Sequence, residues 1–440
     1  MEGTAAISPP LPDLHPGPDV PARVREAFVS TSAWVSFLAG ALTAYTISVV
    51  GEMPVGEILL VAAAAWAVLC VVFNRAWPGP LLRRPGCRHL LAAQAVALVA
   101  YVVSDLYRHS APRDMARGWA RMVFLAIDVV AVAYLFGRSP RNFVIFLLGQ
   151  CAGDFAHAIM PGPMFGDLWK FGVGAPLTCL VFLLAGRGGP KVAALAAFAI
   201  GAVHFRLDYR SYGGVCVLAG MLALLQACHP RFRVWLAPLA LSVVAAALIV
   251  VYDRGREADR ATRSEIERSA MVTAALEAVG ESPLIGHGSW FSNSNVYENF
   301  MLIRHVAAKE ARVGGFADPR RETDTMALHS QLLVALAEGG LFGGAFFLLF
   351  GAGLVRTLAR LVFVQPWHAL APVATLVLLS ALWNLLFSPF SGAHRVYIAV
   401  ACGLILLLPR FDAPRFIPVA AGRNPMGYTP REMETQPDAP

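Results

Sequence analysis

The chain of 440 residues is 57% hydrophobic and only 15% charged, whereas a soluble domain carries about 25% charged residues. Runs of about 20 apolar residues recur along it, each long enough to cross the hydrocarbon core of a bilayer. An ordinary soluble protein is thereby excluded. The formal net charge of +7 is modest, and in a membrane protein such an excess reports orientation rather than nucleic-acid binding.

The two ends of the chain differ from its apolar interior. Residues 1–30 are rich in proline and weakly hydrophobic, so they cannot bury a core and are predicted to form a disordered cytoplasmic N-terminus. Residues 411–440 are again polar and rich in proline, and they are predicted to form a cytoplasmic tail. The seven cysteines lie in apolar segments or at their ends, which supports neither a disulfide framework nor a metal site of the CxxC type.

Between these ends the pattern predicts about twelve membrane-spanning segments, in residues 31–252 and in residues 341–410. They must be helices, because lipid offers the backbone no hydrogen-bonding partner. One polar segment, residues 253–340, separates the two groups. The predicted fold is therefore an all-α, polytopic helical membrane protein with one large helical loop. The spans are predicted at residues 33–50, 57–74, 89–107, 119–137, 141–160, 168–186, 190–206, 211–228, 234–252, 341–361, 368–388 and 395–409.

Basic residues alternate between the short loops. Arginine or lysine stands in every second loop, for example at Arg138 with Arg141 and at Arg187 with Lys191. The positive-inside rule assigns these loops to the cytoplasm. With about twelve spans, both termini are then cytoplasmic and the loop at residues 253–340 lies outside.

Three sites on the predicted outer side break this rule. They are Arg108 with its basic neighbours, Arg206 with Arg210, and Arg395. Such residues either anchor lipid head groups by snorkelling or collect positive charge in an external cavity for an anionic ligand.

The outer loop is predicted to contain two helices. Residues 262–279 have apolar side chains at helical spacing, with Arg268 in the first half. The following Pro283–Gly288, with the sequence PLIGHG, either lets the backbone approach a ligand or forms a plain tight turn. The second helix is predicted to start near Thr325, with that residue or Asp324 as its cap.

His329 is predicted to lie in the early turns of that second helix, beside an apolar stripe. The sequence Glu338-Gly339-Gly340 is expected to break the helix before the chain re-enters the bilayer. A histidine in such a place is either a structural hydrogen-bonding group or a group that transfers a proton.

Together these residues resemble the bacterial O-antigen ligase and polysaccharide polymerase superfamily. Three features occur in the order of that family: Arg210 at the outer start of a span, Arg268 about four helical turns before the Pro283–Gly288 turn, and His329 at the start of an H-S-x-x-L…E-x-G-x-x-G segment. The similarity covers about residues 200–350. The family often has Ser-Arg-Gly at the first arginine, whereas this chain has Tyr-Arg-Ser, so Arg206 is an alternative to Arg210.

The resemblance implies a GT-C-like glycosyltransferase of the bacterial inner membrane that needs no metal ion or other cofactor. The donor would be a glycan on undecaprenyl pyrophosphate, presented at the periplasmic face. The acceptor would be a sugar hydroxyl, on lipid A–core for a ligase or on another lipid-linked glycan for a polymerase.

The chemistry of such a transfer suits the residues of the loop. Arg210 and Arg268 would oppose the negative charge that develops on the departing pyrophosphate, and a neutral His329 would take the proton of the acceptor hydroxyl. Further substrate contacts are expected from Arg206, Gly286, His287, Gly288, Arg304 and Arg395.

The main alternative is a transporter or flippase for an anionic lipid-linked glycan, which would use the same basic cavity without breaking a bond. Inverted repeats would support it, and none is evident in the sequence. A multispan O-acyltransferase also uses a membrane histidine, but the paired arginines and the Pro283–Gly288 turn count against that class.

Overall fold

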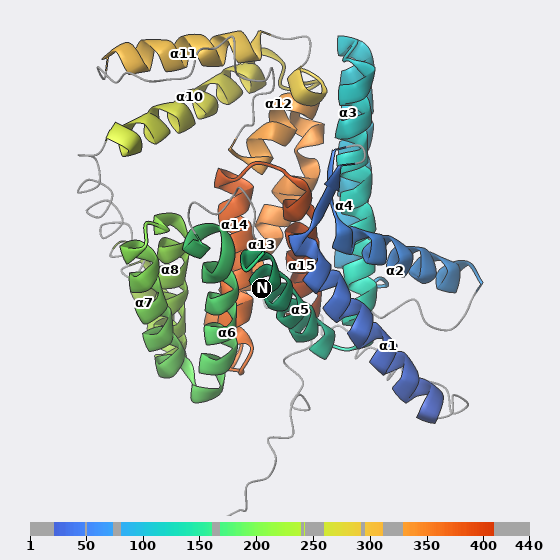
Figure 1. Cartoon of the computed structure of the whole chain (residues 1–440), viewed down its shortest axis with the longest axis vertical. Helices are drawn as coiled ribbons and strands as arrows, with labels where there is room; N and C mark the ends of the chain where they lie inside the picture. Colours follow the sequence, from blue (N-terminus) through green and yellow to red (C-terminus); the bar gives the residue numbers. More distant parts are fainter. Residues whose placement is uncertain are drawn as a thin grey trace, which may run out of the picture.

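The structure is a computed structural model that describes residues 22–48, 51–73, 81–160, 168–238, 242, 259–291, 295–310 and 329–408. Helices dominate this part of the chain, as the sequence predicts. Most of them run roughly along one direction as a bundle, and α10 (Asp259–Glu281) and α11 (Val296–Glu310) lie across one end of it (Figure 1).

The first part of the bundle contains the longest helices. Prolines at the first turn of two of them, Pro85 and Pro112, fit that position because the missing N–H has no helical partner there. The elements are α1 (Ala22–Ala41), η1 (Leu42–Ala44), β1 (Thr46–Ser48), β2 (Glu52–Pro54), α2 (Val55–Val72), α3 (Pro85–Arg108), α4 (Pro112–Arg138) and α5 (Arg141–Ala158).

The second part contains shorter helices and the outer loop. Residues 230–238 are also helical. Besides α10 and α11, the elements are η2 (Trp169–Val173), α6 (Gly174–Ala185), η3 (Gly186–Gly188), α7 (Pro190–Arg206), α8 (Arg210–Ala227), η4 (Ser289–Phe291), α12 (Gln331–Gly343), α13 (Ala345–Phe363), α14 (Ala371–Phe387) and α15 (Gly392–Leu407).

The first predicted span, residues 33–50, is wrong at its C-terminal end. The helix ends at Ala41, and β1 pairs with β2 as an antiparallel hairpin. The β-branched Thr46 and Ile47 favour extended backbone. Gly51 turns the chain with a φ of 118°, which glycine adopts without steric cost.

The predicted disorder of residues 1–30 is wrong for residues 22–30, because α1 already begins at Ala22. This stretch lies beyond the prolines of the N-terminus. It contains alanine, arginine and glutamate, which are favourable in helices.

Several helices have the length and composition of membrane spans, as the sequence predicts. Within the described residues, five are long and apolar enough to cross a bilayer, namely α2, α3, α4, α8 and α13. Shorter apolar helices occur within Thr31–Ala44, Gly174–Gly188, Gln331–Gly343, Ala371–Phe387 and Gly392–Leu407. The ninth predicted span, residues 234–252, lies mostly outside the described residues, and the total of about twelve spans remains a prediction.

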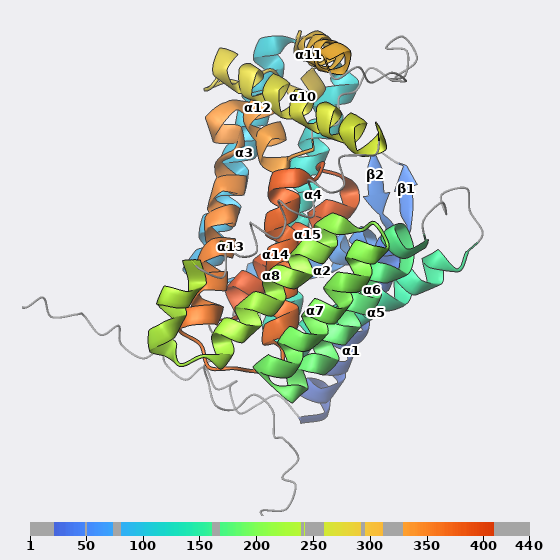
Figure 2. The same ribbon diagram turned by 90° about the vertical axis from the view of Figure 1, so that its left-hand side faces the viewer.

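The loops that the sequence assigns to the cytoplasm meet at one end of the bundle. A guanidinium nitrogen of Arg84, before α3, donates to the carbonyl of Leu406 near the end of α15. Arg233, after α8, donates to the carbonyl of Val362 at 2.8 Å, near the end of α13. The starts of α8, α13 and α15 therefore lie at the other end, which carries α10, α11 and α12 (Figure 2).

Of the five long apolar helices, α4 is the most buried. In its apolar stretch of 18 residues, 67% is buried inside the protein. It packs against α2, α3 and α15. Gly403 of α15 lies so close to it that an added Cβ would stand 2.6 Å from Val132. The buried polar side chains of α4, Arg121 and Asp128, therefore face other helices rather than lipid.

Candidate functional site

The described part of the predicted loop forms a platform together with α12, made of α10, α11 and α12. One face of α10 is rich in alanine, and it packs against Phe291, Phe300 of α11, and Val334 and Ala337 of α12. Small side chains let these helices approach closely. We call α10, α11 and α12 the loop platform.

His329 lies directly before α12 and is exposed. Ser330 has extended backbone, with φ −158° and ψ 120°, and its hydroxyl accepts a hydrogen bond from the backbone N–H of Leu333. Ser330 is therefore the N-cap. The prediction of a helix that starts near Thr325 and contains His329 is wrong on this point, although Thr325 itself lies outside the described residues.

The structure brings His329 next to α10. Its Nδ1 lies 3.0 Å from the sulfur of Met271. Arg268 is exposed three residues before Met271 on the same helix, and residues three apart are neighbours on a helix surface. His329 and Arg268, which were both predicted to be catalytic, therefore lie within about one helical turn of each other along α10.

Arg210 and Arg206 lie below the loop platform, at the ends of α8 and α7. Arg210 is the first residue of α8, and its side chain is 46% exposed with its Nε 3.0 Å from Asp208. Arg206 is exposed at the end of α7. The ends of α7 and α8 at which they stand lie on the side of α10 (Figure 1).

The second half of the Pro283–Gly288 turn, from Gly286 on, is buried against the protein, whereas Pro283 and Leu284 are exposed. The backbone N–H groups of His287 and Gly288 donate to the carbonyls of Ala337 and Glu338, at 2.8 and 2.9 Å. In return, the N–H of Leu341 donates to the carbonyl of Pro283 at 2.7 Å. We call this pairing the turn–kink interlock.

Three glycines make the turn–kink interlock possible. Gly286, Gly288 and Gly340 have φ values of 82°, 81° and 63°. A Cβ on Gly286 would collide with the carbonyl of Glu338, and one on Gly340 with the carbonyl of Leu284. Gly286, His287 and Gly288 are all buried in this packing, and their expected substrate contacts remain a prediction.

The side chain of His287 is also engaged by the protein. Its Nε2 lies 2.9 Å from the carbonyl of Ala278 and 3.9 Å from a carboxylate oxygen of Glu281. Only 6% of the residue is exposed. This geometry ties the turn to the end of α10.

Arg304 joins the two surface helices of the loop platform. It is 4% exposed, and its guanidinium lies 5.4 Å from the ring centroid of Phe300 and 4.0 Å from Glu267 of α10. Arg304 thus packs between α10 and α11, and its expected role in substrate binding remains a prediction.

Arg395 is likewise used inside the protein. Its Nε and Nη2 donate to the two carboxylate oxygens of Glu57 at 2.8 and 2.7 Å, which is the strong bidentate geometry. Nη2 also donates to the carbonyl of Glu52 at 3.3 Å. This pair joins α15 to α2 and the hairpin, and Arg395 is not open to a ligand.

Sequence reasoning missed a buried ion pair below the loop platform. Arg121 of α4 pairs with Glu338 of α12. Tyr101 of α3 donates to the same carboxylate at 2.8 Å, and the N–H of Trp290 donates to its other oxygen at 2.9 Å. The signal was present, since a charge such as Arg121 inside an apolar span marks a functional or structural site by default.

A second set of contacts ties α3 to the segment after the turn. Asp105 accepts hydrogen bonds from the N–H and the hydroxyl of Ser289, at 2.6 and 2.8 Å, and from the indole of Trp119 at 2.8 Å. Trp290 adopts a φ of 63°, which costs roughly 1–2 kcal/mol for a residue other than glycine. The bonds of Ser289 and Trp290 hold this strained backbone in place.

A metal site was not expected from the sequence. Among the residues that the structure describes, no group of three or more histidine, cysteine, aspartate or glutamate side chains is placed to hold a metal ion.

The fold and site together define a polytopic helical membrane protein with an exposed histidine and arginine on a folded platform at one end. Residues 173–348 match the family model described as O-antigen ligase. The resemblance to the O-antigen ligase and polymerase superfamily that the sequence predicts is thus confirmed for this segment. The match includes Arg206, Arg210, Arg268 and His329. No curated protein is similar enough to the chain to give a match.

Proposed function

We propose that this protein is a membrane glycosyltransferase that moves a glycan from undecaprenyl pyrophosphate to a sugar hydroxyl at the periplasmic face, without a metal ion. The observation that carries the proposal is the position of His329 within about one helical turn of Arg268. Both residues are exposed, and both lie inside the segment that matches the O-antigen ligase family.

The arginines would act on the leaving group. As the bond between the anomeric carbon and the pyrophosphate oxygen breaks, its electron pair stays on that oxygen. A guanidinium remains charged at all relevant pH values and can bind two phosphate oxygens at once. Arg268 and Arg210, or Arg206 in place of Arg210, would stabilise this developing charge.

His329 would act on the acceptor. The acceptor oxygen forms the new bond to the anomeric carbon and gives its proton to the imidazole, which is neutral in much of its population near pH 7. The protonated imidazole then returns this proton to water, or to the released pyrophosphate. The start of α12 directly after His329 disfavours a lasting positive charge there.

The proposed reaction implies where the protein is located and which molecules it binds. The distribution of basic residues supports an inner-membrane protein with both termini in the cytoplasm and the loop platform in the periplasm. Its partners would be the lipid-linked donor, a glycan or lipid A–core acceptor, and the bilayer itself.

The test is transfer in vitro from purified lipid-linked donor to either acceptor, with matched amounts of the full chain. His329→Ala should lower turnover by roughly 10²–10⁴-fold, as expected for a lost general base. His305→Ala, an exposed histidine on α11, is the matched control and should keep full turnover. Near-normal turnover of His329→Ala would contradict the mechanism.

The choice of acceptor in that assay separates two forms of the reaction. Transfer to lipid A–core defines a ligase, whereas transfer to a second lipid-linked glycan defines a polymerase. Proteoliposomes loaded with labelled donor test the alternative class. Movement of the donor across the bilayer without any transfer would favour the transporter or flippase.

A further inference from the structure

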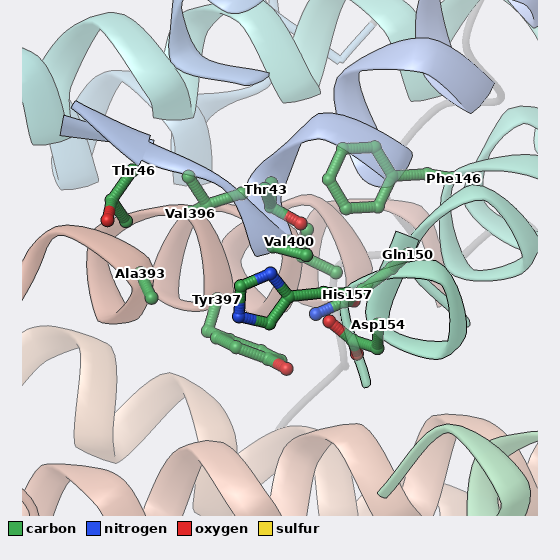
Figure 3. A pocket seen from close by; sticks show the side chains of 11 residues that line it. Thr43, Thr46, Phe146, Gln150, Asp154, His157, Ala393, Val396, Tyr397 and Val400 are labelled. Atoms are coloured by element: carbon green, nitrogen blue, oxygen red, sulfur yellow. The ribbon is translucent and has the colours of Figure 1, made fainter. Parts of the chain in front are cut away.

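A cavity of about 260 Å³ opens between α5, α15 and the segment that joins α1 to the hairpin (Figure 3). It lies outside the residues discussed so far. Six polar side chains line it, namely Thr43, Thr46, Gln150, Asp154, His157 and Tyr397.

The polar groups converge on one space. Asp154, His157 and Gln150 project from α5 toward Tyr397 of α15 (Figure 3). The ring of His157 packs edge-on against Tyr45, with centroids 5.5 Å apart. A concave site lined by a few converging polar groups is typical of ligand-binding sites.

The chemistry of the lining selects against charged ligands. None of the described residues that line the cavity is an arginine or a lysine, so a phosphate would meet the carboxyl group of Asp154 without a compensating cation. A metal ion would find too few ligands, since metal sites need more donors than one carboxylate and one imidazole.

The same lining suits a neutral ligand that is rich in hydroxyl groups. A carboxylate accepts hydrogen bonds, while amide and hydroxyl groups both donate and accept them. Phe146, Val396 and Val400 complete the wall with apolar surface. Sugars combine these two properties, because their hydroxyl edges are polar and their C–H faces are apolar.

The size limits how much can enter. Sites for drug-sized molecules have volumes of about 300–1,000 Å³, and this cavity is smaller at about 260 Å³. One sugar ring fits such a space, whereas a longer stretch of glycan would have to continue outside it.

The cavity opens at the same end of the bundle as the loop platform. Tyr397 lies within two turns of the start of α15, whose other end meets Arg84. A glycan bound here could therefore extend toward the loop platform.

We infer that this cavity binds a single uncharged sugar unit of the glycan substrate, with Asp154 accepting hydrogen bonds from its hydroxyl groups. The inference rests on the proposed glycosyl transfer, because it assigns part of the same substrate. It adds a binding site on α5 and α15 that lies outside the segment matched by the family.

The test measures sugar binding directly in the detergent-solubilised full chain. Saturation-transfer NMR is recorded with glucose, galactose, mannose and N-acetylglucosamine as probes. We expect a signal from at least one of them in the wild type and a loss of at least about fivefold in Asp154→Asn, which removes the acceptor charge. Asp114→Asn changes an aspartate in the first turn of α4 and should leave the signal unchanged.

The absence of any signal from the wild type, or an equal signal from Asp154→Asn, would overturn the inference. The glycan-transfer assay makes the two proposals separable. If Asp154→Asn raises the KM for the glycan at least about tenfold while kcat changes little, the site is supported. If sugar binding depends on Asp154 but the wild type transfers no glycan, the proposed function fails and the sugar site stands.

Discussion

Glu338 is the residue on which the polar contacts of the interior converge. Its carboxylate forms an ion pair with Arg121 and accepts hydrogen bonds from the hydroxyl of Tyr101 and the backbone N–H of Trp290. Its backbone carbonyl accepts a hydrogen bond from the hydroxyl of Ser104 at 2.8 Å. It is 1% exposed. Because this group is buried and bonded to several partners, it fixes the arrangement of its neighbours. It thereby links α3, α4 and α12 below His329.

Removing the charge of Glu338 should destabilise the protein. Glu338→Gln leaves the guanidinium of Arg121 buried without a counter-ion, which costs about 3–5 kcal/mol. We expect a clear fall in the unfolding temperature of the purified protein in detergent. Glu281→Gln, whose side chain is 59% exposed, is the control. Equal unfolding temperatures for the two variants would show that the ion pair contributes little.

Arginine at positions 268 and 210 should not be replaceable by lysine. A point charge cannot reproduce two parallel hydrogen bonds to phosphate, so Arg268→Lys and Arg210→Lys should each lose about 2–4 kcal/mol of transition-state stabilisation. The measurement is kcat/KM for glycan transfer. Arg113→Lys, at the exposed start of α4, should retain activity. If Arg206→Lys loses activity while Arg210→Lys keeps full activity, the arginine that contacts phosphate is the one at the end of α7.

At the scale of elements, the sequence patterns predicted most helices but not the contacts between them. Every predicted span overlaps a described helix, because apolar length alone defines such segments. The span at residues 234–252 does so over residues 234–238, beyond which most of it lies outside the described part of the chain. The hairpin after α1 was missed because its residues are as apolar as a helix end. The start of α12 was misplaced because Ser330 and Asp324 are equally good caps by composition.

The candidate site was predicted only where the residues are close in sequence or carry a motif. The pairing of Arg121 with Glu338 spans 217 positions, and no local pattern encodes such a contact. Likewise, the G-x-G of the Pro283–Gly288 turn indicates a close approach of backbone. What it approaches, here the kink at Gly340, is decided by the fold.

The turn–kink interlock should depend on glycine at position 340. Gly340→Ala places a Cβ against the carbonyl of Leu284 at a φ of 63° and a ψ of −164°, a conformation that is essentially restricted to glycine. We expect loss of folded protein in gel filtration and a lower unfolding temperature. Gly280→Ala is the matched control. Its Cβ meets no atom within 4 Å, and alanine within α10 should stabilise by about 0.5–1 kcal/mol.

At the scale of the whole molecule, the two ends of the bundle have different chemistry. One end carries arginines that cap the last carbonyls of helices, as Arg233 does at Val362. The other carries the loop platform, the ends of α7 and α8, and the sugar-sized cavity. This polarity supports a protein that anchors one face at the cytoplasm and works at the opposite face.

Cysteine labelling in intact cells tests this polarity. Thr273 on α10 and Arg187 in η3 are both exposed, and they lie at opposite ends of the bundle. An impermeant thiol reagent should label Thr273→Cys before lysis and Arg187→Cys only after lysis, relative to wild-type protein with its native cysteines. The reverse pattern would place the loop platform in the cytoplasm and remove the basis for a periplasmic donor.

The hydrogen bond between Ser104 and Glu338 can form only late in the synthesis of the protein, because the two residues are 234 positions apart. At about 5–20 residues per second, a ribosome needs roughly 10–50 s to travel that distance. Throughout this interval α3 is already made, while the groups that satisfy Ser104 are still missing. A nascent chain that stops before α12 therefore contains a membrane helix whose polar residue Ser104 does not yet have its partner. The insertion machinery has to keep this polar surface away from lipid until translation reaches Glu338.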